Sequence, residues 1–87
     1  MRRIAEIRDD FEATDRQIGE LLERRMALSV EIAEAKRAEG VPVLQEGRRQ
    51  EMQRMWQENC PSYSRESVEK LYEILHDESV KKQNTLK

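Results

Sequence analysis

The sequence predicts an all-α protein with three helices per chain, one of them very long, assembled as an intertwined helical-bundle homodimer. Apolar residues recur at heptad spacing through residues 4–35, and no stretch shows the alternation typical of a β-strand. Hydrophobic residues make up only 37% of the 87 residues, so the single domain expected over residues 1–87 has a thin core. A short chain of this kind is stabilised by sharing its core with a second copy.

Local signals set the expected ends of the three helices. The first is expected over about residues 3–39, because Gly40 follows the last apolar residue of the periodic pattern. The second is expected over about residues 45–59, just before a proline. The third begins near Ser64, which is a good N-cap residue, and continues into the 80s.

The first helix carries a heptad seam that predicts the dimer. At ~1.5 Å per residue a helix of this length spans about 55 Å, whereas a 100-residue globule has a radius of gyration of only ~13 Å. Two shorter helices of one chain cannot cover such a seam, but a second copy of the first helix, packed antiparallel, can. The seam residues are Ile4, Ile7, Phe11, Thr14, Ile18, Leu21, Arg25, Leu28, Ile32 and Ala35.

Charge and composition exclude several classes of function. With 16 basic and 18 acidic residues the chain has no basic excess, so we expect no nucleic-acid partner. No metal-ligand spacing occurs, and we interpret Cys60 and His76 as structural or incidental residues, with no metal site. No apolar run approaches the ~20 residues of a membrane span, and no signal peptide is visible, so we expect no membrane partner and a cytoplasmic protein.

Cations occupy unusual positions on the first helix. Arg25 lies within the apolar seam, where it serves as an anion-binding group or, alternatively, controls helix register. Lys36 follows eleven residues later, which returns it to within about 20° of the same face. Arg8 lies ~25 Å from Arg25 along the axis, so it can reach only the pocket of an antiparallel partner.

The other two helices also lead from apolar stripes into polar side chains. The stripe of the second helix leads back to Arg48 and Gln45, and that of the third leads on to Ser79 and Gln83. Fixed cations with neutral donors suit a small polyanion and the charge that develops on it in a transition state. The alternative is a set of solvated or salt-bridged surface residues in a chain that is 39% charged. The stripes are Met52, Met55 and Trp56 in the second helix, and Val68, Leu71, Tyr72 and Leu75 in the third.

Several short strings, in their order and spacing, give the chain a resemblance to the all-helical chorismate mutases over nearly its whole length. The resemblance implies a domain-swapped dimer in which the long first helix spans both active sites. It also implies an isomerase of the shikimate pathway of aromatic amino acid biosynthesis, which rearranges chorismate to prephenate without a cofactor or covalent intermediate. The matching strings are Ile7-Arg8 with Asp15, Leu21-Leu22-Glu23-Arg24-Arg25, Ala33-Glu34-Ala35-Lys36, Pro42-Val43 and Ser79-Val80-Lys81-Lys82-Gln83.

The resemblance also implies roles for individual residues. Arg25 and the partner's Arg8 are expected to hold the two carboxylates of chorismate, with Ser79 assisting at a carboxylate. Lys36 and Gln83 are expected to donate to the ether oxygen, which gains negative charge as its C–O bond breaks. Together these groups hold the reactive chair-like conformer in place.

Two positions depart from the family pattern near Arg48, which is expected to line the pocket by the ring hydroxyl. Gln45 stands where the family usually has an aspartate, and Arg49 stands where it usually has a glutamate that accepts a hydrogen bond from that hydroxyl. Either Gln45 takes over this contact, Arg49 turns out to solvent, or the substrate differs.

Three alternatives to a chorismate mutase therefore stay open. The first is a related activity in the same fold, either an isochorismate pyruvate lyase or a mutase for an amino analogue of chorismate. The second is a non-catalytic helical dimerisation module. The third is a degenerate or artificially generated family member that folds but works poorly.

Overall fold

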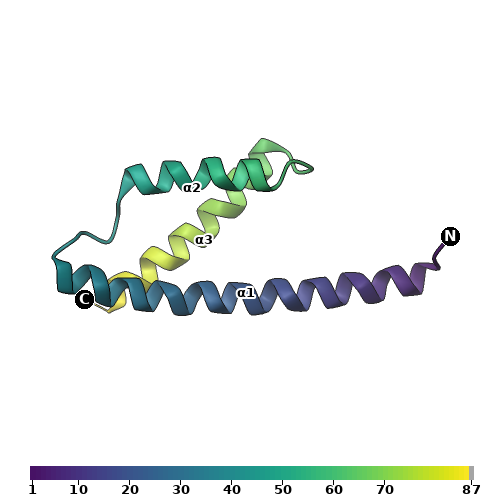
Figure 1. Ribbon diagram of the computed structural model, residues 1–87, viewed down its shortest axis with the longest axis horizontal. Coiled ribbons are helices and arrows are strands. Elements are labelled where there is room, and N and C mark those ends of the chain that lie inside the picture. The colour runs from purple at the N-terminus through teal and green to yellow at the C-terminus, as the bar shows by residue number, and fades with distance from the viewer. Residues whose placement is uncertain (87) are drawn as a thin grey trace.

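The computed structural model describes residues 1–86 as three helices without a strand, which confirms the predicted all-α class. Helix α1 spans Ile4–Glu39, α2 spans Glu46–Asn59 and α3 spans Arg65–Thr85. Helix α3 contacts both α2 and the C-terminal part of α1, while the N-terminal half of α1 extends away from the other two helices (Figure 1). The molecule is therefore elongated, with extents of 56 × 24 × 15 Å.

The helix ends form where the local signals predicted them. Helix α1 stops because Gly40 adopts the left-handed conformation, with φ of 69°, and its N–H donates to the Arg37 carbonyl at 3.3 Å. Helix α3 starts at Ser64, whose hydroxyl oxygen accepts a hydrogen bond from the backbone N–H of Ser67 at 3.2 Å. Gln45 precedes α2 without a capping bond from its side chain.

The core is small and lies where α3 meets α1 and α2. Its buried apolar residues are Ala33, Val68 and Tyr72, the last two only 2% exposed. The Trp56 ring of α2 packs against the Tyr72 ring of α3 with centroids 6.0 Å apart. This packing fixes the crossing of the three helices and with it the position of the polar side chains nearby.

Most of the seam of α1 is uncovered in the single chain. Ile4, Phe11 and Leu21 are 69%, 66% and 64% exposed, although their spacing is that of a buried stripe. Charged residues separate these side chains along the helix. No helix among residues 1–86 is both long and apolar enough to cross a membrane. The second copy that would cover the seam stays a prediction.

Candidate functional site

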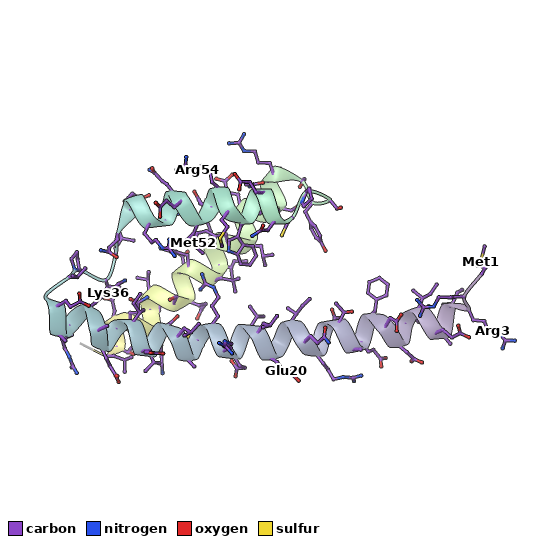
Figure 2. The ribbon with its side chains drawn as sticks, viewed as in Figure 1. Met1, Arg3, Glu20, Lys36, Met52 and Arg54 are labelled. Carbon is purple, nitrogen blue, oxygen red and sulfur yellow. The ribbon has the colours of Figure 1, made fainter. Side chains whose placement is uncertain are left out.

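A cavity that lies between the three helices and is open on one side collects most of the predicted site residues. Its volume is about 360 Å³, and it lies between the C-terminal half of α1, the start of α2 and the C-terminal half of α3. Figure 2 shows Lys36 near the crossing of α1 and α3, and Met52 on the side of α2 that faces α3, whereas Arg54 points away. Seven predicted residues line the cavity, namely Arg25, Lys36, Gln45, Arg48, Arg49, Ser79 and Gln83.

Arg8 is the predicted site residue that the single chain does not bring to the cavity. It is exposed on the extended half of α1, about 25 Å from Arg25 along the helix axis. Its proposed contribution from a partner subunit therefore stays a prediction.

Lys36 and Gln83 form the most closely connected pair in the cavity. The Lys36 ammonium donates to the Val43 carbonyl at 2.6 Å and to the Gln83 Oε1 at 3.0 Å. Because lysine only donates, this contact fixes which way the Gln83 amide points. Desolvation by burial lowers the pKa of Lys36 below its ordinary value.

Two serines continue the hydrogen bonds from Gln83 back to α1. The Gln83 Nε2 donates to the Ser79 Oγ at 3.0 Å, and the hydroxyls of Ser79 and Ser29 are 2.6 Å apart. The Ser29 hydroxyl also donates to the Arg25 carbonyl at 3.0 Å. Sequence reasoning missed Ser29, although it follows the seam arginine by one helical turn and is only 4% exposed.

Arg25 lies half-buried and is held on two sides. Its guanidinium donates to the Leu75 carbonyl at 3.4 Å and lies 6.0 Å from the centre of the Tyr72 ring. Burial raises the pKa of Tyr72, while the positive charges of Arg25, Arg49 and Arg48 oppose that shift. The phenol therefore stays a neutral group beside three cations.

The corner near α2 contains Arg48 and Arg49. Arg48 pairs with Glu51 at 3.2 Å in an exposed setting. Arg49 pairs with Glu46 at 3.3 Å and with Glu73 of α3 at 3.6 Å, and its Nε is buried without a hydrogen-bond partner among the described residues. Arg49 therefore does not turn out to solvent, which was one of the three alternatives for this corner, because Glu73 holds it at the cavity wall.

Tyr72 and His76 also line the cavity, although sequence reasoning gave neither a role in binding. Their rings lie 5.7 Å apart, and the His76 Nδ1 is buried without a hydrogen-bond partner in the described part of the chain. Both precede Ser79 and Gln83 on one face of α3, at spacings of four, three and four residues. That spacing was the signal that could have found them.

The lining of the cavity has a restricted chemistry. It combines four cations and several neutral donors with apolar side chains, and none of its lining residues is an aspartate or glutamate. Within residues 1–86, no group of His, Cys, Asp or Glu side chains is placed to hold a metal ion, and the free Cys60 lies outside the cavity. Such a site suits a small anion with several acceptor atoms.

Comparisons with known proteins identify a family for this chain but no individual relative. Neither the curated proteins nor the solved structures gave a match to this chain. A sequence model described as chorismate mutase type II matches residues 7–84, which include nearly all of α1, all of α2 and all but the last residue of α3. The chain therefore belongs to the chorismate mutase type II family.

Proposed function

We propose that this protein is a chorismate mutase that rearranges chorismate to prephenate within the cavity described above. The observation that carries the proposal is the pair of connected donors, Lys36 and Gln83, in a cavity without a carboxylate. Family membership supplies the reaction class. The cavity supplies fixed positive charge, which a rearrangement with a developing oxyanion requires more than it requires a nucleophile or a base.

The two donors each keep a hydrogen for the ligand. Lys36 has three N–H groups and gives two of them to the Val43 carbonyl and to Gln83. The Gln83 amide has two N–H groups and gives one to Ser79. The remaining hydrogens of Lys36 and Gln83 serve the ether oxygen, where negative charge grows as the C–O bond breaks. Because protein contacts already hold both side chains, little reorganisation accompanies that charge.

The carboxylates of the substrate are assigned to the arginines. Arg25 offers a guanidinium whose other contacts are a carbonyl at 3.4 Å and the Tyr72 ring, and no carboxylate among residues 1–86 pairs with it. A planar guanidinium binds a carboxylate through two parallel hydrogen bonds. Ser79 assists at one carboxylate, and the partner's Arg8 holds the other.

A homodimer completes this site. One chain leaves the seam of α1 uncovered and leaves Arg8 far from its own cavity. A second copy whose α1 runs antiparallel covers the seam and carries its own Arg8 toward the open side of the cavity. Each of the two cavities then contains residues from both chains.

Arg49 argues against one of the related substrates. An amino analogue of chorismate carries an amine, which is protonated near neutral pH as a lysine is, at the place of the ring hydroxyl. Arg49 lies at the cavity wall, where it repels a second positive charge, although its pairs with Glu46 and Glu73 weaken that repulsion. A hydroxyl accepts a hydrogen bond from Arg49 or from Gln45, so hydroxyl-bearing substrates are favoured, which leaves isochorismate cleavage as the second candidate.

Loss of chorismate absorbance with purified protein tests the proposal directly. We expect turnover of chorismate, slower turnover of isochorismate and least activity on the amino analogue. Arg25→Ala is expected to lower kcat/KM by about 10²–10³-fold with unchanged helix content. The matched control Arg54→Ala removes an arginine from the outward face of α2 and should act as wild type.

Two results would contradict the proposed enzyme. One is inertness of the well-folded protein toward all three substrates, which favours a non-catalytic dimerisation module. The other is an Arg25→Ala variant with wild-type turnover, or with a more stable dimer and no change in function, because a structural arginine in the seam predicts that outcome.

A further inference from the structure

Ser29 is a buried hydroxyl whose place in the cavity the proposed reaction does not use. It is 4% exposed, lies on α1 one turn after Arg25 and lines the same cavity as Ser79 and Gln83. A serine inside a helix commonly donates to the carbonyl four residues earlier, and Ser29 does so at 3.0 Å. The unusual feature is its second contact, the 2.6 Å approach to the Ser79 hydroxyl on α3.

Donor chemistry gives this set of hydrogen bonds one direction. The Arg25 carbonyl only accepts, so it takes the single proton of the Ser29 hydroxyl. The Ser79 hydroxyl must then supply the proton that lies between the two serine oxygens. Ser79 accepts from Gln83, and Gln83 accepts from Lys36, so the bonds run from Lys36 through Gln83, Ser79 and Ser29 to the Arg25 carbonyl.

This direction leaves Ser79 without a proton for a ligand. Its hydroxyl has one hydrogen, and Ser29 holds it. Ser79 can donate to an anionic oxygen only if the Ser29 hydroxyl first turns its own proton from the Arg25 carbonyl to the Ser79 oxygen. This rotation of the Ser29 hydroxyl leaves no carbonyl without a partner, because the Arg25 carbonyl still accepts the helical hydrogen bond from the backbone N–H of Ser29.

We propose that Ser29 is a positioning residue for the substrate carboxylate, because its hydroxyl rotates toward Ser79 and thereby frees the Ser79 proton for the ligand. In the liganded state the Ser79 oxygen accepts from both Ser29 and Gln83 and donates to the carboxylate. The identity of the anion rests on the proposed function, whereas the direction of the hydrogen bonds rests on this chain's own contacts.

The kinetic test compares Ser29→Ala with Ser29→Thr, which keeps the hydroxyl. We expect Ser29→Ala to raise the KM for chorismate about two- to tenfold with kcat within twofold, as loss of one supporting hydrogen bond implies. Ser29→Thr should restore a KM near wild type. The matched control Thr85→Ala, which removes an exposed hydroxyl bonded to the Lys82 carbonyl of α3, should leave both constants unchanged.

A double-mutant cycle separates positioning from general destabilisation. In a Ser79→Ala background the Ser29 hydroxyl has nothing to orient, so adding Ser29→Ala should leave KM unchanged. A second rise in KM of the same size as in wild type would overturn the proposal. A fall in kcat at constant KM would also overturn it, because Ser29 would then act on the reacting bond.

A readout without turnover keeps this inference distinct from the proposed function. The two side-chain amide hydrogens of Gln83 report by NMR on its bond to Ser79. Ser29→Ala should shift these resonances and speed the exchange of the bonded hydrogen, whereas Thr85→Ala should not. If the wild type is inert toward chorismate but this shift occurs, the proposed substrate is wrong, while the hydrogen bonds from Gln83 through Ser79 to Ser29 are supported. If Ser29→Ala leaves the Gln83 amide resonances unchanged, the proposed role of Ser29 in positioning Ser79 is wrong.

Discussion

At the scale of single residues, the cavity partly buries the charge of Lys36 without neutralising it. Lys36 loses hydration on entering the cavity, and its partners are a backbone carbonyl and a side-chain amide rather than a carboxylate. Desolvation therefore lowers the pKa of Lys36, with no opposing ion pair. One N–H of the ammonium stays free of these contacts, so in the proposed reaction its protonation state becomes a condition for turnover.

The first prediction concerns the pH dependence of kcat/KM, which reports on the free enzyme. In the proposed reaction the protonated form of Lys36 is the active one, and its pKa is lowered, so activity should fall on the alkaline side at a lower pH than an ordinary lysine would give. Tyr72 shifts in the opposite direction and should titrate later. Lys36→Arg keeps its charge at all these pH values, so any remaining activity should lack this alkaline fall. A profile shared by wild type and Lys36→Arg would show that another group titrates.

The second prediction tests whether Arg49 selects the ring substituent. Arg49→Gln removes a positive charge from the cavity wall but keeps donor groups there. We expect the ratio of kcat/KM for the amino analogue to that for chorismate to rise at least about tenfold, as relief of ~1.4 kcal/mol of repulsion implies. Arg54→Gln, on the outward face of the same helix, should leave the ratio unchanged. A constant ratio in Arg49→Gln would mean that Arg49 has no part in specificity.

At the scale of the helices, local signals predicted the elements well, whereas the contacts between elements were predicted only in part. The stop at Gly40 and the start at Ser64 depend on a few neighbouring residues, and the structure confirms both. The positions of Arg49 and Ser29 depend on where α3 crosses the other two helices. Glu73 draws Arg49 to the cavity wall, and Ser79 faces Ser29 across a gap of fifty residues in sequence. The spacing of residues along one helix does not predict such contacts between helices.

The third prediction concerns the end of α1. Gly40 has φ of 69°, and nothing lies within 4 Å of a Cβ built there, so Gly40→Ala meets only backbone strain. We expect a loss of about 1–2 kcal/mol in the free energy of unfolding, measured by denaturant titration. Gly47 lies within α2 with equally open space, so Gly47→Ala should instead stabilise by about 0.5–1 kcal/mol. If both substitutions changed the free energy of unfolding in the same direction, this account would be contradicted.

At the scale of the whole molecule, a single chain has much apolar surface and little core. Of residues 1–86, three apolar residues are buried, while most of the seam of α1 is exposed along a molecule 56 Å in length. Figure 1 shows the N-terminal half of α1 with no other element beside it. A chain whose longest helix is half uncovered would gain stability by the proposed pairing with a copy, and in that dimer we expect Arg8 of each chain to reach the cavity of the other.

The last prediction tests the proposed exchange of residues between chains. Arg8→Ala and Arg25→Ala should each be inactive as pure dimers, because each removes one arginine from both cavities. A heterodimer of the two variants has one cavity without either arginine and one cavity with both. Random mixing makes about half of the dimers heterodimers, so about one quarter of wild-type turnover should return. If mass measurement detects heterodimers and turnover stays absent, the proposed sharing of each cavity between two chains is wrong, because only that arrangement gives the heterodimer a cavity with both arginines. Restored turnover would therefore show that the two chains share each site.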